Sequence, residues 1–416
     1  PERYLLTKLV GGGFRVGVSK LLVQRAIAER AGLQASEVAQ RMMGYTQASV
    51  QPTAQDWLRL IGQAQGDRAL QQGQPYPFFL AQSLNPADEG QLESVMGPVD
   101  DWLVEWKYDG IRAQVVRRAQ QVWIWSRGEE LITDRFPEVA QAAQALPDGT
   151  VLDGELLVMR QGHPASFAEL QTRITRKTLS KAILAKTPVS FIAYDLLEHQ
   201  GQDWRPQAQQ RRRQALQVLL SEGPFSVSPL AEPDASTPSW AALQALRQQS
   251  RARGVEGFML KHRAAPYGLG RRKLEGPGVL GWWKWKVQPM TCDAVLIYAQ
   301  KGHGRRASLF TDYTFAVWNE GALVPFARAY SGLSDAEIRE VDRFIREHTQ
   351  ETFGPVRSVT PELVFELAFE GIQPSPRHKS GIAVRFPRML RWRRDKRADQ
   401  ADSLQTLRQL LAGVGQ

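Results

Sequence analysis

The sequence around Lys107 is suited to covalent chemistry on a phosphate. Lys107 lies in the stretch Glu105-Trp106-Lys107-Tyr108-Asp109-Gly110-Ile111-Arg112, directly after the apolar run Trp102-Leu103-Val104. The apolar run predicts a strand, and the Asp-Gly pair predicts a tight turn at its end. Such a turn lets the backbone approach a nucleotide, and the arginine after it supplies a fixed positive charge. A lysine becomes a nucleophile when desolvation or neighbouring cations lower its pKa. A surface lysine at a hairpin is the alternative on this stretch alone.

Five further stretches carry polar or charged residues within runs that are otherwise apolar and strand-like. Burying a charge is costly unless it is paired or holds a ligand, so the recurrence of such residues at strand ends indicates a ligand. The stretches are Trp125 to Gly128, with Arg127; Val151 to Leu157, with Asp153 and Glu155; Phe191 to Leu197, with Tyr194 and Asp195; Val255 to Lys261, with Glu256; and Trp282 to Lys286, with Lys284 and Lys286 on one strand face.

Together the six stretches form a set suited to nucleotidyl transfer. They supply a lysine nucleophile, arginines, acids that can hold a divalent metal, an aromatic ring that can stack on a base, and a lysine pair for a phosphate. Each stretch alone is also typical of a half-buried strand with one solvated edge. That interpretation weakens because all six stretches occur in one chain.

The elements that must position these residues divide the chain into three expected domains. Residues 1–73 are predicted to be helical, residues 74–289 to mix strands and helices, and residues 290–416 to form short strands with one inserted helix. Strands and helices without strict alternation favour an α+β fold over a doubly wound sheet, and the last region fits a small OB-type barrel. A polar segment with two prolines, Gln71 to Pro77, is the expected linker.

The pattern also predicts the individual elements. Strands are expected over 102–107, 111–117, 122–126, 150–159, 189–197, 255–261, 294–299, 307–318, 322–330 and 363–369. Helices are expected over 207–220 and 239–253, from a capping box at Ser334 as far as His348, and over 404–411. In the first region Ser19, Ser36 and Thr53 are expected to cap three short helices.

One glycine-rich segment precedes those helices. Gly11 to Gly17 contains Arg15 and is expected either to lie against a phosphate backbone or to be a plain interhelical loop. The two interpretations are equally favoured by the segment alone.

The composition favours a polyanionic partner. The 416 residues carry a net charge of +10, with 43% hydrophobic and 23% charged residues. This charge indicates nucleic acid first and an anionic membrane second. No apolar run is long enough to span a bilayer, and no signal-peptide pattern is present. The one cysteine, Cys292, excludes an internal disulfide and a multi-cysteine zinc site and fits an intracellular setting. The chain opens on Pro1, so we expect it to be part of a longer protein.

In order along the chain, these stretches resemble the motifs of the ATP-dependent DNA ligases of the covalent nucleotidyltransferase superfamily. Lys107 to Arg112 resembles the first motif and Ser126 to Gly128 the element after it. The later motifs are matched by Asp153 to Glu155, Tyr194 to Leu196, Glu256 to Lys261, Lys284 to Lys286, and His378 to Lys396. The N-terminal helices with Gly13 to Val18 resemble the end of the helical DNA-binding domain of bacterial members. The resemblance covers essentially the whole chain.

The resemblance implies a multidomain α+β protein with a partial helical DNA-binding domain over 1–73, an adenylation (nucleotidyltransferase) domain over 74–289 and a C-terminal OB-fold barrel over 290–416. Lys107 is expected to be adenylated by ATP, and AMP then to pass to the 5′-phosphate of a nick before the nick is sealed. The residues expected to bind ATP or AMP are Glu105, Arg112, Arg127, Glu155, Tyr194, Lys284, Lys286, Arg388, Arg393 and Lys396. Glu155 and Glu256 are expected to hold Mg²⁺ or Mn²⁺, and Arg15, Arg385 and Arg391 to contact DNA.

Within this set the resemblance implies particular roles. Glu105 is expected to accept a hydrogen bond from the adenine amino group, and Tyr194 to stack on the base. Lys284 and Lys286 are expected to grip the α-phosphate and to keep Lys107 unprotonated by repulsion. The basic run 385–397 is expected to orient pyrophosphate or to face DNA, with equal weight on both roles.

Two positions depart from the family pattern. Tyr194 stands where many members carry phenylalanine, and Arg394 stands where an acid is common.

Three other functions are alternatives. RNA ligases and mRNA-capping guanylyltransferases share the lysine motif, but the helical N-terminal region and Arg385 to Arg388 favour a DNA ligase. An NAD-dependent ligase is disfavoured because one cysteine cannot build that class's zinc module. A non-catalytic DNA-binding protein is disfavoured because DNA binding alone does not require the lysine nucleophile and the other residues suited to nucleotidyl transfer.

The implied partner is nicked double-stranded DNA, without a membrane. A monomer is the default expectation, and a bacterial cytoplasm, near the nucleoid, is the expected location.

Overall fold

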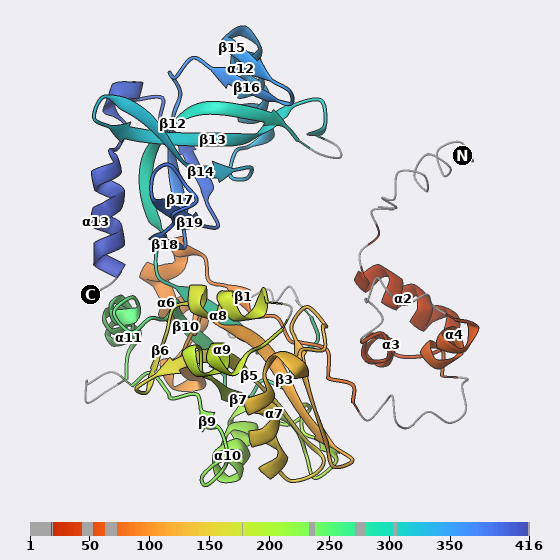
Figure 1. Cartoon of the computed structure of the whole chain (residues 1–416). Coiled ribbons are helices and arrows are strands. Elements are labelled where there is room, and N and C mark those ends of the chain that lie inside the picture. Colours follow the sequence, from red (N-terminus) through yellow and green to blue (C-terminus); the bar gives the residue numbers. More distant parts are fainter. Residues whose placement is uncertain are drawn as a thin grey trace. The chain divides into compact units, whose positions relative to one another are not determined.

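In the computed structural model of this protein, the chain divides into two compact units, Pro1–Lys286 and Val287–Gln416 (Figure 1). The structure describes residues 18, 20–43, 53–62, 73–176, 178–232, 238–270, 280–302 and 306–414. The first unit contains both the N-terminal helices and the expected adenylation domain. The second begins at Val287, close to the expected border between 289 and 290.

The described residues of the N-terminal segment form three short helices, α2 (Lys20–Ala31), α3 (Ala35–Arg41) and α4 (Ala54–Leu60). Thr53 caps α4 through a complete capping box with Asp56, which confirms the expected cap. The expected cap at Ser36 is wrong, because α3 begins one residue earlier. The Glu37 carboxylate accepts a hydrogen bond from the Gln34 backbone N–H at 2.9 Å, which makes Gln34 the N-cap residue of the helix that begins at Ala35. Ser19, Arg15 and the segment Gly11 to Gly17 lie outside the described residues.

A four-stranded sheet carries the Lys107 stretch. Its strands are β1 (Gln82–Ser83), β2 (Trp102–Trp106), β10 (Gly257–His262) and β11 (Trp282–Lys286), in the order β1-β11-β10-β2. The outer face packs against α6 (Leu92–Met96) and α11 (Trp240–Arg247) through a cluster that includes Leu92, Trp240 and Trp285. Every residue of β2 is buried, because this strand is covered on both faces.

A second sheet of seven strands faces the first. Its main path runs β4-β3-β5-β7-β8, and β6 and β9 pair with β5 and β7. The strands are β3 (Ile111–Arg118), β4 (Gln121–Ser126), β5 (Thr150–Arg160), β6 (His163–Pro164), β7 (Val189–His199), β8 (Gln202–Asp203) and β9 (Ser226–Val227). The helices of this part are α7 (Pro137–Ala142), α8 (Phe167–Ile174), α9 (Lys181–Lys186) and α10 (Gln209–Leu219).

A buried cluster joins the two sheets. It includes Phe79, Val116 and Trp125 together with Tyr267 and Trp282. The six strands expected in this region are confirmed to within one or two residues at each end. Most residues of β2, β3, β5 and β7 are buried, which is why runs rich in valine, isoleucine and aromatic residues located these strands.

The second unit is a sheet built around the long strand β12. Its elements are β12 (Met290–Lys301), β13 (Phe310–Asn319), β14 (Ala322–Ala329), α12 (Asp335–Glu347), β15 (Thr349–Phe353), β16 (Val356–Val359), β17 (Val364–Phe369), β18 (Gly371–Pro374), β19 (Ile382–Arg385), β20 (Arg388–Trp392) and α13 (Leu404–Val414). β12 pairs with β13, β16 and β17, and its register with β13 shifts at two places. Such irregularities bend a strand, and in the described part of this unit one helix, α12, is inserted between strands β14 and β15; both features fit an OB-type domain. The capping box at Ser334 and Glu337 is confirmed.

Among the described residues, every helix is too short or too polar to cross a lipid bilayer.

Candidate active site

Backbone pairing holds Lys107 beside Glu256. The Lys107 N–H donates to the Gly257 carbonyl, and the Glu256 N–H donates to the Lys107 carbonyl, both at 2.8 Å. These two bonds continue the antiparallel ladder of β2 and β10 past the end of β2. The two side chains therefore emerge together, and Lys107 Nζ lies 2.5 Å from Glu256 Oε2.

The turn after Lys107 passes directly over β5. A Cβ atom at Gly110 would lie 2.4 Å from the Leu156 carbonyl oxygen and 2.9 Å from Glu155 Cγ. Only glycine fits this approach. The Gly110 N–H donates to Glu155 Oε1 at 3.2 Å, so the same turn brings Glu155 to the site of Lys107.

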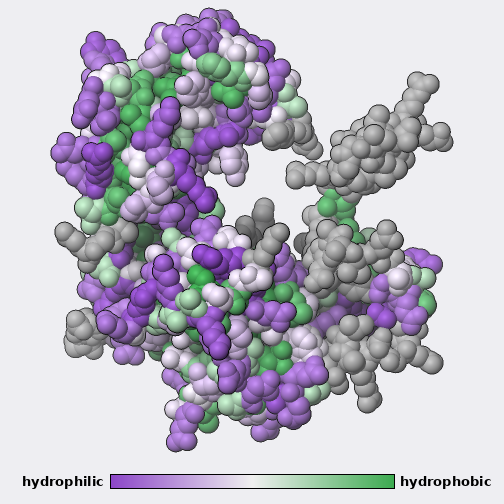
Figure 2. All heavy atoms as spheres, viewed as in Figure 1, coloured by the Kyte–Doolittle hydropathy of each residue, from purple (hydrophilic) through white to green (hydrophobic). Residues whose placement is uncertain are grey.

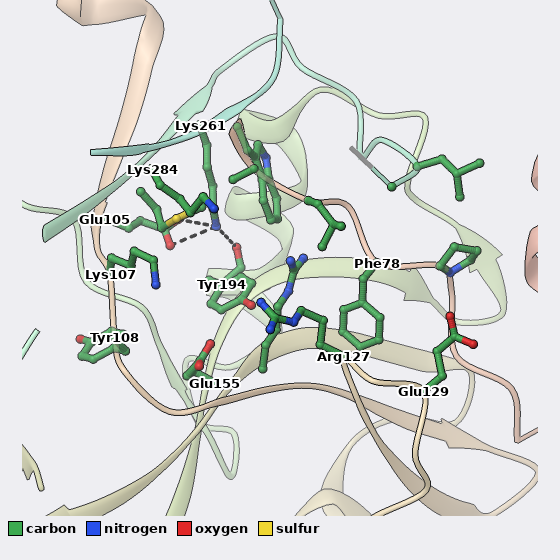
Figure 3. Close-up of a pocket in the computed structure, with 18 of the residues that line it drawn as sticks. Phe78, Glu105, Lys107, Tyr108, Arg127, Glu129, Glu155, Tyr194, Lys261 and Lys284 are labelled. Carbon is green, nitrogen blue, oxygen red and sulfur yellow. Dashed lines mark hydrogen bonds and ion pairs between the residues drawn. The ribbon is translucent and has the colours of Figure 1, made fainter. Parts of the chain in front are cut away.

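Lys107 and Glu155 border a cavity of about 680 Å³ between the two sheets of the first unit, whereas Glu256 and Lys286 are not among its lining residues. In Figure 3 the side chains of Lys107, Glu155, Tyr194 and Lys284 turn towards one space from different strands. Seven residues expected from the sequence line it: Glu105, Lys107, Arg112, Arg127, Glu155, Tyr194 and Lys284. Its size is typical of sites that bind a nucleotide-sized ligand.

Glu256 lies between two lysines. Its Oε2 is 2.5 Å from Lys107 Nζ and 3.3 Å from Lys286 Nζ. Burial by itself would raise the pKa of Glu256, but the two lysines outweigh burial and lower it. Repulsion between Lys107 and the lysine pair was expected to keep Lys107 unprotonated. The structure instead places a carboxylate between Lys107 and Lys286, which offsets that repulsion.

Glu155 has the opposite electrostatic setting. Burial raises its pKa from 4.5 to about 7, although Lys107 and Arg112 act to lower it. Asp153 also contributes to the rise. The two carboxyl groups nearest to Lys107 are therefore shifted in opposite directions, an arrangement typical of functional sites.

This contrast predicts opposite pH dependences of stability. A carboxyl whose folded pKa is raised stabilises the fold below its unfolded pKa, and this contribution is lost as the pH rises through the folded pKa. Relative to Glu155→Gln, the wild-type free energy of unfolding should therefore fall by about 3 kcal/mol between pH 4.5 and pH 8. Denaturant titrations of both proteins across this range measure the difference.

Glu256→Gln is the matched control. Because the folded pKa of Glu256 is lowered, its contribution is present above pH 4.5 and is lost only as the pH falls further. The wild-type minus Glu256→Gln difference should stay flat from pH 5 to pH 8. Parallel curves for the two variants would contradict the assignment.

The Arg112 side chain, which lines the cavity, is held by Asp153, a residue that was not predicted to belong to the site. Its guanidinium contacts Asp153 through two bonds, at 3.1 Å and 2.7 Å, and donates to the Phe79 carbonyl at 2.7 Å. The Tyr267 hydroxyl donates to the same Asp153 at 2.7 Å, and Asp153 is 0% exposed. Asp153 stands in one of the stretches singled out above, and its burial within an apolar strand was the signal for a charged partner.

Glu105 is also fixed by partners that sequence analysis left out of the site. Its carboxylate is ion-paired to Lys261 of β10 and to Arg213 of α10, each at 3.0 Å. Lys261 is buried, and burial lowers its pKa although Glu105 acts to raise it. The position of Lys261 at the end of the Val255 stretch was visible in the sequence, but its partner, Glu105, lies 156 residues away.

In the second unit the expected basic run is largely neutralised by acids of the same unit. Arg388 pairs with Glu370, Arg391 with Glu366, and Arg394 with Glu340. Further pairs are Arg393 with Asp293 and Asp395, Lys396 with Asp293, and Arg397 with Asp399. Arg385 lies over the exposed ring of Phe386. In Figure 2, hydrophilic residues cover much of the visible face of this unit, with hydrophobic ones between them.

The carboxylates of the site fit a divalent metal only together with a ligand. No cluster of three or more His, Cys, Asp or Glu that could hold a metal occurs among the described residues. Mg²⁺ is commonly bound by one or two carboxylates and completed by substrate phosphates and water. Glu155 and Glu256 lie near Lys107 and match this type of Mg²⁺ site.

Comparisons with known proteins agree with this geometry. Residues 79–286 match the family model of the ATP dependent DNA ligase domain, and residues 306–396 match that of the ATP dependent DNA ligase C terminal region. A probable DNA ligase of Koribacter versatilis is 36% identical over 97% of this chain and 71% of its own length. A probable DNA ligase of Opitutus terrae is 35% identical over 99% of this chain and 45% of its own length.

A solved structure of a Lig E DNA ligase shares the fold. It is 20% identical, with a TM-score of 0.50, over 77% of this chain and 100% of the other. The chain thus matches both family models in sequence order, and it spans only part of the two relatives in length.

Proposed function

Since this chain belongs to the family of ATP-dependent DNA ligases, we propose that Lys107 is the residue that carries AMP and that the cavity beside it binds ATP. The observation that supports this most strongly is that Lys107, Glu155 and Lys284 line one cavity, while Glu256 pairs with Lys107 and Lys286 beside it. Enzymes of this family use ATP and a divalent metal to seal nicks in duplex DNA.

Three phosphoryl transfers make up the proposed reaction. Lys107 Nζ forms a P–N bond with the α-phosphate of ATP while the bond to pyrophosphate breaks. An oxygen of the 5′-phosphate at the nick then attacks the adenylyl phosphorus, and Lys107 leaves. Finally the 3′-hydroxyl attacks the 5′-phosphate, the DNA backbone is joined and AMP leaves. Catalysis of such steps is mostly positioning and charge stabilisation.

The first step requires the neutral amine of Lys107. In the free protein this nitrogen contacts Glu256 at 2.5 Å, so that contact must break or pass a proton before the attack. We propose that arriving phosphates draw Lys286 and Lys284 towards themselves, so that Glu256 loses a neighbouring cation and becomes basic enough to take the proton of Lys107. A bound divalent metal neutralises charge that develops on the phosphates, and Glu155 and Glu256 are the side chains that would hold it.

The remaining wall of the cavity is assigned to the nucleoside. Glu105 accepts from the adenine amino group, and the ring of Tyr194 stacks on the base. Glu155 binds the ribose as an alternative or additional role, and Arg112 and Arg127 contact the ribose or the nick phosphates. Because Arg112 is already bonded to Asp153, it acts as a fixed charge at the cavity wall.

The second unit and the N-terminal helices are assigned to pyrophosphate and DNA. Arg388, Arg393 and Lys396 orient pyrophosphate, and Arg385 and Arg391 contact DNA. Since most of these cations are ion-paired with acids, binding a phosphate requires an exchange of partners. We further propose that the N-terminal helices belong to a helical DNA-binding domain, that the protein acts as a monomer, and that it works at the bacterial nucleoid.

One labelling experiment tests the proposed function. The protein is incubated with Mg²⁺ and with ATP, GTP or NAD labelled in the adenylyl or guanylyl phosphate, and acid-stable and acid-labile label on the protein is measured. We expect label from ATP alone, with the acid lability of a phosphoramidate. Label from GTP would indicate a capping-type enzyme, and no label from any of the three would support a binding protein.

A further inference from the structure

Lys261 is a buried lysine at the wall of the cavity. Its ammonium group has three N–H donors, and the structure gives each one an acceptor. Two go to the oxygens of Glu105, both at 3.0 Å, and the third goes to the backbone carbonyl of Tyr194 at 2.9 Å. Figure 3 shows the three bonds converging on this nitrogen. The side chain is 1% exposed, so water does not compete for these bonds.

The bonds to Glu105 determine what this carboxylate can offer a ligand. Oε1 accepts from both Lys261 and Arg213, whereas among the described residues Oε2 accepts from Lys261 alone. A carboxylate has about four acceptor sites. Lys261 and Arg213 use three of them, so the fourth, on Oε2, is left for a donor in the cavity, which Glu105 lines.

The same ammonium also fixes the aromatic wall of the cavity. Besides its bond to the Tyr194 carbonyl, Lys261 Nζ lies 4.5 Å from the ring centres of both Tyr194 and Trp282. Cation–π contacts at this distance favour one placement of the rings. Lys261 therefore links two groups that contact a bound base. The Glu105 carboxylate contacts the edge of the base, and the Tyr194 ring contacts its face.

We propose that Lys261 is a positioning residue that makes the cavity select 6-aminopurines over 6-oxopurines. This inference rests on the proposed function, in which adenine lies against Tyr194 and Glu105. With three acceptor sites occupied, Glu105 presents one acceptor to position 6 of the base. An amino group bonds to it, whereas a 6-oxo group sets two desolvated acceptors against each other. A mismatch of this kind in a buried site lowers reaction efficiency by about 10²-fold or more.

Inosine triphosphate is the probe that isolates position 6, because it differs from ATP in carrying an oxo group there with a proton on N1. The measured quantity is the ratio of kcat/KM for self-adenylation with ATP to that for self-inosylation with ITP. We expect a ratio of at least about 10² for the wild type. Absence of label from ATP would overturn the proposed function itself. Label from ATP with a ratio near 1 would overturn only the present inference.

Substitutions at Lys261 test its part in the selection. Lys261→Met should reduce the ratio to less than about 10 and should raise the KM for ATP more than it lowers kcat. Lys261→Arg keeps the charge and should rescue part of the ratio. A merely structural role would lower both efficiencies equally and leave their ratio unchanged, which would count against the proposal. Lys181→Met, at an exposed position of α9, is the control expected to keep the wild-type ratio.

A double variant guards against a folding defect. Lys261→Met alone leaves Glu105 with Arg213 as its remaining partner, so that protein is at risk of misfolding. Glu105→Gln combined with Lys261→Met removes both charges, and the glutamine amide can donate to a 6-oxo group. If this protein melts cooperatively, its ratio should be near or below 1. A ratio that stays at about 10² in the folded double variant would overturn the assignment.

Discussion

Replacing Lys107 by arginine is expected to abolish the attachment of AMP to the protein. Arginine keeps the positive charge next to Glu256, but its guanidinium does not lose a proton in proteins and cannot act as the nucleophile. Self-adenylation with labelled ATP should fall by at least about 10³-fold, because no other group replaces the attacking amine. Overall sealing of a nicked duplex with ATP should fall by the same factor.

A second substrate separates the role of the amine from a general defect. On a nick whose 5′-phosphate already carries AMP, the joining step uses the 3′-hydroxyl as nucleophile and does not use the lysine. The Lys107→Arg protein should therefore retain sealing of this pre-adenylated nick to within about tenfold, because the charge in the cavity is preserved. Recovery of a lysine–AMP adduct from another position of the Lys107→Arg protein would refute the assignment.

The sequence located the local parts of this site well. The Lys107 stretch combines an apolar strand with a glycine turn, and both features are encoded by neighbouring residues. Enrichment in β-branched and aromatic residues likewise placed β3, β5 and β7, which carry Arg112, Glu155 and Tyr194. These features can be recognised in the sequence because strand composition and turn chemistry depend on residues a few positions apart.

The pairing of charges across the fold could not be predicted in the same way. Arg112 and Asp153 are 41 residues apart, and Lys261 and Glu105 are 156 apart. Their contact depends on the register in which β3 meets β5 and β10 meets β2, and no local pattern specifies that register. The sequence therefore showed that buried charges require partners without showing which residues provide them.

The second unit shows the same limit in its short strands and in its basic run. β15 is almost entirely exposed, so it lacks the apolar alternation by which strands were recognised. The run from Arg385 to Arg397 was expected to orient pyrophosphate or to face DNA, and its acidic partners Glu340, Glu366 and Glu370 were not predicted because they come from other elements. Exchange of these partners for phosphate would make DNA or pyrophosphate binding strongly dependent on salt.

The ion pair between Arg112 and Asp153 should have the largest effect on stability of any single contact near the cavity. Asp153 is 0% exposed and forms two bonds with the guanidinium of Arg112 and one with the Tyr267 hydroxyl. Asp153→Asn keeps the size of the side chain but leaves a buried guanidinium without its countercharge. Removal of one partner of a buried pair typically destabilises a protein by about 3–5 kcal/mol. We expect a loss of this size in the free energy of unfolding, measured by denaturant titration.

Glu169→Gln is the matched control for this prediction, because it breaks an ion pair of similar length at the surface. Arg160 and Glu169 lie 2.6 Å apart with side chains that are 50% and 37% exposed, whereas the Arg112–Asp153 pair spans 2.7 Å with side chains that are 14% and 0% exposed. Exposed pairs contribute about 0–1 kcal/mol, since water and salt screen them. The two variants should therefore differ by several-fold in their effect on unfolding. Equal losses would mean that burial of Asp153 does not govern the strength of its pair, and Arg112 would then not be a fixed charge at the cavity wall.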